Sequence, residues 1–222
     1  MYVPRQYRPP GPEWNDEIVR RFPLALLVNS GPDRPFATHL PTLLARDLDG
    51  VAGEGAELAG GRIYGHLNQA NPHWGALRSG IAATLVFQGP NGYVSPTVYG
   101  ITPAAPTWNF TAVHLHGTVR RIEDRELTMR IVCATVRALE GRLGAEWDMS
   151  DSTDYFRQML PAVGAFAVDI EAVDGMFKLS QEQRPEIRRR TSTAFAASTR
   201  GLHRELAAMM NRLDAGEHDG PR

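Results

Sequence analysis

The sequence predicts an α+β fold that is mainly β, built on an antiparallel barrel with helices at its periphery. Segments of strand length with β-rich or alternating composition recur from residue 24 to residue 122. Turn residues separate these segments, and no helix of the length that a parallel crossover requires is predicted between them. Apart from one helix near the N-terminus, helical periodicity begins after residue 123. These observations favour an antiparallel barrel over a doubly wound sheet.

Length and composition bound the class of protein. The 222 residues predict one large domain over residues 1–182, which begins with an extended arm (1–12), and a C-terminal helical arm over residues 183–222. A net charge of −1 gives no general attraction to nucleic acid or to anionic membranes. Cys133 is the only cysteine, which excludes an intrachain disulfide and suits a reducing cytoplasm. No signal peptide and no apolar run of roughly 20 residues is visible. We therefore expect a cytoplasmic protein without membrane or nucleic-acid partners.

The first half of the chain supplies most of the predicted strands. Residues 13–22 predict a helix with Trp14, Ile18 and Phe22 on one face, and Pro23 ends it. In the second strand Pro41 predicts an edge or bulged position, because proline cannot donate to a ladder. The predicted strands are 24–29, 36–44, 62–67, 81–88, 93–99 and 107–122, with a turn at 89–92 and a solvated loop at 48–60.

The second half is predicted to be mainly helical. Asp124 is a candidate N-cap for a helix that ends near Leu143, and a short helix follows at residues 154–160. Residues 165–170 alternate as a strand does, and residues 175–180 form a last strand or its exit. From residue 184 onward the pattern is helical, with Leu202, Leu206, Met209 and Leu213 at helical spacing.

The stretch 61–74, GRIYGHLNQANPHW, carries the strongest candidate for chemistry. His66 leaves a predicted strand just before a polar loop, with aromatic residues near it in sequence. A histidine there can present a ring nitrogen while the sheet holds its backbone, which suits an iron or cofactor ligand. The alternative is a strand end whose side chains are all satisfied within the protein.

The remaining histidines make no zinc-type pattern. Alternation over residues 107–122 predicts one face with Trp108, Phe110, Ala112, His114 and His116, and the opposite face with Asn109, Thr111, Val113 and Leu115. His114 and His116 could share a metal, but no cysteine or carboxylate cluster completes a site. Motifs of zinc proteases, serine hydrolases and dinucleotide-binding proteins are absent. Cys133 is expected to be a small buried hydrophobe.

Five blocks of the chain resemble the PaiB-like family, in the order that the family shows. They span most of residues 1–200 and read PFATHLP (35–41), GHLNQANPHW (65–74), VFQGPNGYVSPTVY (86–99), PTWNFTAVHLHG (106–117) and FKLSQEQRPEIR (177–188). The resemblance implies a flavin-reductase-like split β-barrel that forms a homodimer with its cofactor at the subunit interface. Many family members are described as FMN-binding negative transcriptional regulators.

The sequence also resembles one branch of that family, the heme-dependent piperazate synthases. Val98, where the family usually has tryptophan, and the pair His114 and His116 carry this likeness. The resemblance implies heme b as cofactor and N5-hydroxy-L-ornithine as substrate, closed to L-piperazate by net dehydration for nonribosomal peptide biosynthesis. His66 would be the axial iron ligand, with His114 or His116 next in line.

The resemblance extends to further site residues. His73 or His39 would act as the general base. Tyr93, Trp108 and Phe110 are candidates for the cofactor wall, although aromatic residues at strand spacing are also typical of a core. Ser95 is a candidate for cofactor binding, or serves only the turn. Lys178, the only lysine, either binds a propionate or phosphate or is a solvated strand end.

Two other functions compete with this interpretation. The first is an FMN-binding regulator or flavin oxidoreductase on the same fold, and the second is a heme-binding protein without catalysis. The near-neutral charge and the lack of a recognisable helix-turn-helix disfavour the regulator. The basic run Arg188–Arg190 could touch DNA, but such a run is usually a solvated helix face.

Overall fold

The computed structural model describes residues 1–49, 57–145 and 147–218. Six antiparallel strands close into a barrel in the order β1-β2-β3-β6-β5-β4, which confirms the predicted fold class. The strands are β1 (Leu24–Asn29), β2 (Phe36–Leu44), β3 (Arg62–Asn68), β4 (Ala82–Val94), β5 (Thr107–Ile122) and β6 (Val163–Lys178). The predicted loop at 48–60 lies partly outside the described residues.

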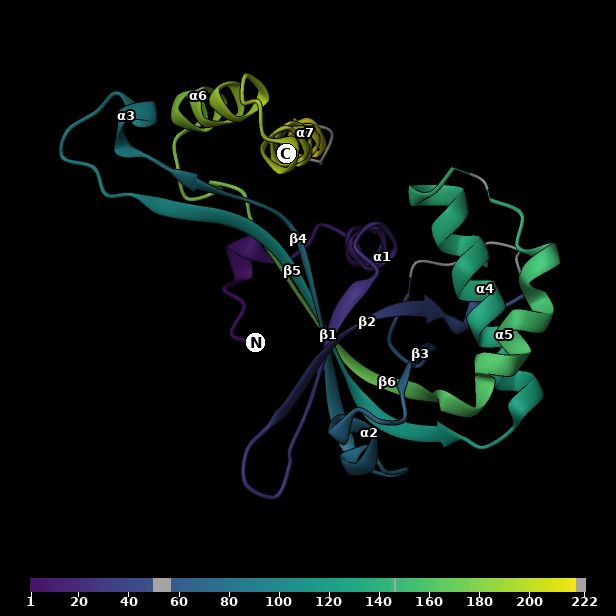
Figure 1. Ribbon diagram of the computed structural model, residues 1–222. Coiled ribbons are helices and arrows are strands. Elements are labelled where there is room, and N and C mark those ends of the chain that lie inside the picture. Colours follow the sequence, from purple (N-terminus) through teal and green to yellow (C-terminus); the bar gives the residue numbers. More distant parts are fainter. Residues whose placement is uncertain (50–56, 146, 219–222) are drawn as a thin grey trace. The chain divides into compact units, whose positions relative to one another are not determined.

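Seven helices accompany the barrel within the described part of the chain (Figure 1). They are α1 (Pro12–Arg21), α2 (Pro72–Ala76), α3 (Pro96–Tyr99), α4 (Arg125–Leu143), α5 (Thr153–Met159), α6 (Pro185–Ala196) and α7 (Gly201–His218). Short 3-10 turns occur at Arg5–Tyr7, Ala45–Asp47, Ser150–Ser152 and Leu160–Ala162. The region predicted as a C-terminal helical arm contains two helices, α6 and α7. Among the described helices, none combines the length and apolarity needed to cross a membrane.

Contacts divide the chain into two compact units. The first, unit 1, contains residues 1–21, 88–113 and 174–222, and the second, unit 2, contains residues 22–87 and 114–173. Strands β4, β5 and β6 are long enough to contribute to both units. The predicted domain boundary at residue 182 stays a prediction, because these units are groups of contacts and not tested folding domains.

Unit 2 holds the interior of the barrel. Alternation along each strand turns one set of side chains inward, and the central ones are fully buried: Leu27, Ile63, Leu85, Leu115 and Phe166. Outside the barrel, α4 packs Ile131 against Tyr64, Ala165 and Ala167. Asp124 caps α4 as predicted, since its Oδ1 accepts from the backbone N–H groups of Glu126 at 2.8 Å and Leu127 at 3.2 Å. Cys133 is buried beside Met129, as expected of a small hydrophobe.

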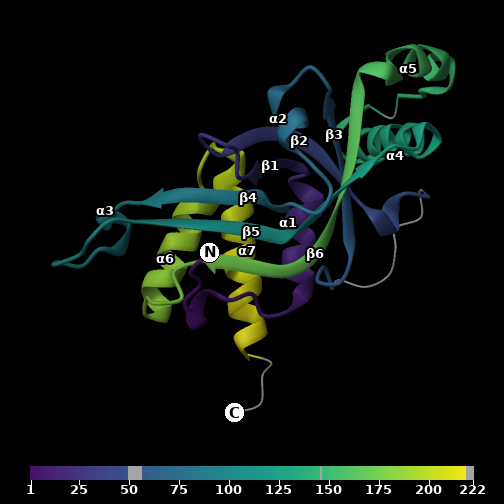
Figure 2. The ribbon, with the colours of Figure 1, turned by 90° about the horizontal axis from the view of Figure 1, so that it is seen from below.

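In unit 1, helices α1, α6 and α7 lie along one face of the ends of β4, β5 and β6 (Figures 1 and 2). Trp14 of α1 meets Phe177 of β6 edge to face, with ring centroids 5.5 Å apart. Leu206, Met209 and Leu213 of α7 are buried, whereas Leu202 is 43% exposed.

The predicted turn at residues 89–92 is wrong, because β4 runs through it without a break. Gly89 serves close packing there: a Cβ on it would lie 2.2 Å from Oγ1 of Thr111. Gly92 likewise lies directly beneath the ring of Phe195. The predicted strand 93–99 ends at Val94, and Ser95 and Pro96 begin the short helix α3 instead.

The strands predicted at 165–170 and 175–180 are one strand, β6. Between them, residues 171–174 keep strand pairing although they are only partly buried or exposed, so the apolar alternation pauses while the strand continues.

Candidate cofactor site

His66 lies on the outer face of the barrel, in unit 2. In β3 the side chains of Ile63 and Leu67 turn inward, and a Cβ on Gly65 would meet the buried ring of Phe166, so Tyr64 and His66 turn outward. His66 is half-buried, and among the described residues its buried Nδ1 has no hydrogen-bond partner. Burial lowers the pKa of His66, which favours the neutral imidazole that binds metals.

A row of outward-facing positions runs across four strands at His66. Leu24 of β1 pairs with Pro41 of β2, and His66 pairs with Ala165 of β6. Extending the β2–β3 register, in which Thr42 is opposite Gly65, places Pro41 opposite His66. The row is therefore leucine, proline, histidine and alanine; Leu24 is 62% exposed, whereas Ala165 is buried beneath Ile131 of α4. This is an apolar strip with one imidazole.

The residues around His66 suit a metal that brings its other ligands with it. Within the described residues, no group of three or more His, Cys, Asp or Glu side chains could hold a metal ion. A porphyrin supplies four nitrogen ligands and a flat apolar surface, so it asks the protein for one neutral imidazole and an apolar wall. His66 and its neighbours offer these two features.

His73, the first residue proposed as general base, is held on both sides of its ring. Its side chain is 1% exposed, Nδ1 lies 2.7 Å from Oγ1 of Thr38, and Nε2 is bonded to Oδ1 of Asn29. Asn29 donates its amide to the carbonyl of Ser30, so Oδ1 accepts and Nε2 of His73 carries the proton. Nδ1 then accepts from the Thr38 hydroxyl, and Phe36 stacks on the ring at 5.3 Å.

Neither nitrogen of His73 is therefore free for substrate in this arrangement. Burial lowers the pKa of His73, in agreement with a neutral ring. Its role as a base stays a prediction, and these contacts weigh against it.

His39, the second candidate base, is exposed on the outer face of β2. The inward side chain of its neighbour Leu40, 2% exposed, fixes this orientation. Extending the same β2–β3 register puts His39 opposite Asn68, two positions along the strand from the place opposite His66. His39 and His66 thus lie diagonally on one face of adjacent strands, and of the two candidate bases only His39 faces solvent.

In unit 1, two of the predicted wall aromatics meet. Tyr93 and Trp108 are each 51% exposed, and their ring centroids lie 5.9 Å apart. Trp108 donates its indole N–H to Oδ1 of Asn91 at 3.2 Å. Phe110 is half-buried on the same face of β5, since Asn109 and Thr111 take the buried face. All three aromatic side chains are at least partly exposed to solvent, so they do not belong to a buried core.

Ser95 and Lys178 both have partners within unit 1. The Ser95 hydroxyl accepts from the N–H of Thr97 at 3.3 Å and so caps α3. Lys178 donates to Oγ1 of Thr107 and lies 5.8 Å from the ring centroid of Tyr7. Cofactor roles for these two residues stay predictions. The local contacts give each of them a structural role as well.

His114 and His116 lie on one face of β5, as predicted, and that face turns outward. Their ring centroids are 6.1 Å apart, and Nδ1 of His116 lies 3.0 Å from the hydroxyl of Thr84. The two rings meet edge to face.

Asn29 and Thr38, which fix the tautomer of His73, were not predicted from the sequence. Each is an ordinary polar residue at the end of a strand or within one, and nothing local marks it as a partner of a residue more than 30 positions away. The one local signal is Asn71-Pro72, where the Asn71 side chain accepts from the N–H of His73 at 2.9 Å and places the ring.

The comparisons with known proteins identify the family. Residues 1–172 match the family model described as "Putative FMN-binding domain". The chain belongs to this family. It is 27% identical over 186 residues to the Protease synthase and sporulation protein PAI 2 of Bacillus subtilis, which covers 82% of this chain and 83% of that protein. The predicted PaiB-like family is thereby confirmed.

Two solved structures share the fold of this PaiB-like protein. One is the FAD and heme binding protein from Mycobacterium smegmatis, with a TM-score of 0.54 at 17% identity, over 79% of this chain and 75% of that one. The other is the flavocytochrome Anf3 from Azotobacter vinelandii, with a TM-score of 0.51 at 19% identity, over 73% of this chain and 65% of that one. The split-barrel prediction is confirmed at the level of the fold.

Proposed function

We propose that this PaiB-like protein is a heme-dependent piperazate synthase, which converts N5-hydroxy-L-ornithine to L-piperazate and water. The observation that carries the proposal is the apolar row at His66. It combines one neutral imidazole, whose buried Nδ1 has no partner within the described residues, with the apolar side chains of Leu24 and Pro41 beside it. The likeness of the sequence to the piperazate synthase branch supplies the reaction.

The reaction balances without an outside oxidant or reductant. A bond forms between the α-amine nitrogen and N5, the N5–O bond breaks, and the hydroxyl leaves as water with a proton from the amine. When bound, heme supplies a Lewis-acidic iron that polarises the N–O group.

The chain's own residues would divide the remaining work. His66 would hold the cofactor through its neutral ring. His39, exposed on the same barrel face, could take the proton that the α-amine loses. An arginine or backbone N–H groups would hold the substrate carboxylate, and the protein walls would keep the flexible substrate folded so that amine and N5 meet.

Flavin binding is the second candidate function, and the family description favours it. FMN would require groups for its phosphate, and among the predicted residues Lys178 and Ser95 could provide them. Of the two structurally similar proteins, one is named as an FAD and heme binding protein and the other as a flavocytochrome. Both names support a site for either cofactor on this fold. A heme-binding protein without catalysis is the third candidate.

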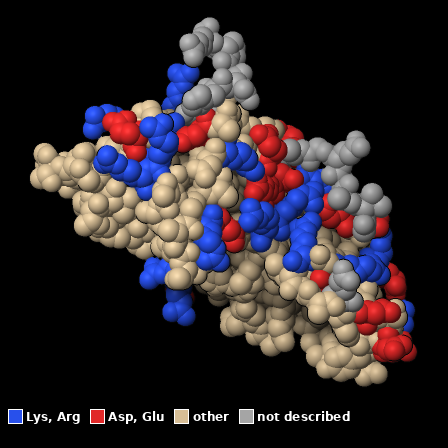
Figure 3. Space-filling view, turned by 90° about the horizontal axis from the view of Figure 1, so that it is seen from above, with Lys and Arg blue, Asp and Glu red and all other residues tan. Residues whose placement is uncertain are grey.

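A DNA-binding regulator finds less support. Arg188 is 8% exposed and pairs with Asp214 at 2.6 Å, and Arg190 donates to the carbonyl of Tyr99 at 2.7 Å. Two of the three arginines in the basic run are thus engaged within unit 1. On the face seen in Figure 3, red side chains lie among the blue ones.

The homodimer remains part of the proposal. Tyr93 and Trp108, two large exposed aromatics in contact, suit an interface between subunits or between subunit and cofactor. Light scattering of the purified protein, with and without heme, measures the mass directly.

Visible spectroscopy followed by a turnover assay tests the function. A Soret band after purification or heme titration supports the piperazate synthase and the non-catalytic heme protein. Flavin bands alone would instead support the flavin-binding protein. Incubation of the heme-loaded protein with N5-hydroxy-L-ornithine should then give a product lighter by one water in mass spectra. A strong Soret band without this product would contradict the synthase and support a heme-binding protein without catalysis.

A further inference from the structure

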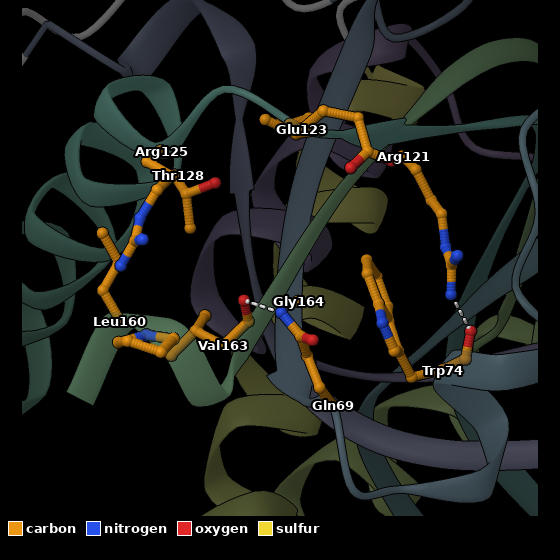
Figure 4. A pocket seen from close by; sticks show the side chains of 11 residues that line it. Gln69, Trp74, Arg121, Glu123, Arg125, Thr128, Leu160, Val163 and Gly164 are labelled. Carbon is orange, nitrogen blue, oxygen red and sulfur yellow. Dashed lines mark hydrogen bonds between the residues drawn. The ribbon is translucent and has the colours of Figure 1, made fainter.

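Two of the cavities among the described residues differ in the ligands that they could hold. In unit 2, a cavity of about 380 Å³ is lined largely by polar and charged side chains, and Arg121 and Arg125 lie at its opposite ends with the ring of Trp74 between them (Figure 4). Arg121 is already engaged, since its Nη2 donates to the carbonyl of Trp74. These two cations therefore do not converge on one ligand.

The second cavity lies in unit 1 and is mainly apolar. We call it the Trp14 pocket. Its volume is about 450 Å³, which lies within the range of small-molecule sites, and residues at the start of α1 and the end of α7 form its walls. Its lining residues are Pro10, Glu13, Trp14, Arg212, Leu213 and Gly216.

The charge of Arg212 in this pocket is balanced by its neighbours. Its guanidinium carbon lies 3.6 Å from the centroid of the Trp14 ring, and Nη1 donates to Oε2 of Glu17 at 2.5 Å. Glu17 also accepts from Arg21 at 2.7 Å, and Arg21 donates to Glu205 at 2.8 Å. The positive charges of these two arginines are therefore offset by the two glutamates.

Glu13 supplies a charge that is not balanced in this way. It is exposed in the first turn of α1, and within the described residues it has no ion pair. A Cβ on Gly11 would lie 2.3 Å from Oε2 of Glu13, so the carboxylate lies over Gly11, next to the lining residue Pro10. A carboxylate beside an apolar cavity favours an ammonium group on the ligand.

The remaining walls suit a flat apolar group. Trp14 is 5% exposed and Leu213 is 9% exposed, so both present apolar side chains that are already fixed by packing. Gly216 has open space beside it, because a Cβ on it would meet nothing within 4 Å. The guanidinium of Arg212, whose side chain is 45% exposed, is a planar group of the kind that stacks on aromatic rings.

We propose that the Trp14 pocket binds a small arylalkylammonium ion. The ammonium group donates to the carboxylate of Glu13, and the aromatic ring lies against Leu213 and Gly216. This arrangement needs only one charged partner from the protein. All lining residues belong to unit 1, and the site requires no cofactor, so it does not depend on the proposed function.

The test is a titration of the full-length protein with 2-phenylethylamine, followed through the indole N–H signal of Trp14 in ¹⁵N–¹H spectra. We expect a saturable shift of this signal. 3-Phenylpropanoate, in which a carboxylate replaces the ammonium group, should leave the signal unmoved. The uncharged 2-phenylethanol should bind about tenfold more weakly than the amine, because it lacks the charge-assisted contact.

Glu13→Gln should weaken the binding of 2-phenylethylamine by about tenfold, because the same contact is lost. Glu186→Gln is the matched control, since Glu186 also follows a proline in the first turn of a helix, α6, but lies outside the pocket. Both variants lose a carboxylate that favours its helix, so urea unfolding should show similar small losses of stability. Only Glu13→Gln should lose affinity.

A second pair of variants tests the apolar space. Gly216→Leu places a side chain in the pocket and should abolish the saturable shift. Gly201→Leu, on the same helix and outside the pocket, is its control, because a Cβ there also meets nothing within 4 Å. Leucine favours a helix over glycine at both positions, so neither variant should unfold.

The proposal would be overturned by any of four results. These are no saturable shift with 2-phenylethylamine, equal binding of 3-phenylpropanoate, equal affinities of Glu13→Gln and Glu186→Gln, or equal affinities of Gly216→Leu and Gly201→Leu. Each titration is measured at Trp14 and not through the Soret band. Failure of the proposed function, shown by the absence of a Soret band, would therefore leave the amine result intact.

Discussion

The ring of His73 sits between Thr38 and Asn29, with Nδ1 2.7 Å from the Thr38 hydroxyl. Thr38 also receives the side-chain amide of Asn71 at 3.4 Å, which leaves its own proton for His73. Because Asn29 accepts from Nε2, Nδ1 of the neutral ring accepts from the Thr38 hydroxyl. Protonation of Nδ1 would require the Thr38 hydroxyl to turn and accept instead of donate.

This network predicts a pH dependence of stability. Burial lowers the pKa of His73 in the folded state, so between that pKa and the unfolded value of about 6.5 the unfolded chain binds more protons. The contribution of His73 to the free energy of unfolding is therefore complete above about pH 6.5. As pH falls below this value the contribution is lost, by up to about 1.4 kcal/mol per pH unit. Urea unfolding between pH 5 and pH 8 measures the slope.

In His73→Gln the slope should be smaller, because one titrating group is gone. Some slope should remain, since burial also lowers the pKa of His66, and burial and Arg200 lower that of His203. Thr38→Val removes the hydroxyl that donates to Nδ1 of the neutral ring, so its slope should lie between those of the wild type and His73→Gln. Equal slopes in all three proteins would show that His73 does not control the acid sensitivity.

Sequence patterns predicted the parts of this fold that depend on local periodicity. The bounds of β1, β2 and β5 match the predicted strands, because β1 is an apolar run of strand length between Pro23 and a turn, and the side chains of β2 and β5 divide between two faces. Gly89 misled the prediction, since glycine serves turns and close approaches equally well, and only the position of Thr111 distinguishes them. The apolar row at His66 depends on register between strands, which no single segment of sequence contains.

The candidate site shows the same limit. A histidine near a strand end could be located from local sequence, but its free nitrogen could not. His66 and His73 are seven residues apart, and the sequence made the first a candidate iron ligand and the second a candidate base. The fold gives His73 two partners from β1 and β2 and leaves Nδ1 of His66 without one in the described structure.

The cap of α4 can be tested by Asp124→Ala. Loss of the two backbone hydrogen bonds should lower the free energy of unfolding by about 1 kcal/mol, within a usual range of about 0.5–2. Asp33→Ala, an exposed change in the β1–β2 loop, is the control and should change it by less than about 0.5 kcal/mol. Equal effects would indicate that α4 is held by packing alone.

Gly164→Ala should destabilise the protein and displace the ring of Trp74. An added Cβ would lie 2.6 Å from the Trp74 ring, which is held in place by Arg121, so the indole must move. We expect a cost of about 1–3 kcal/mol in thermal or urea unfolding. Gly141→Ala in α4, where nothing lies within 4 Å of the new Cβ, should be stabilising by up to about 1 kcal/mol. A neutral Gly164→Ala would mean that the indole has room to shift.

His66→Ala tests the ligand on which the proposed function depends. Removing the imidazole should weaken heme binding by more than about a hundredfold, since the loss of an iron ligand should cost more than the loss of its supporting partners. The Soret band in a heme titration measures this change, and added imidazole should restore part of it. The matched control is His39→Ala, which removes an exposed histidine on β2 two residues from Pro41, the residue opposite His66. This variant should bind heme normally but turn over more slowly. If His66→Ala kept the Soret band of the wild type, the ligand would have to be another residue, and His114 and His116, on the outer face of β5, would be the next two to replace.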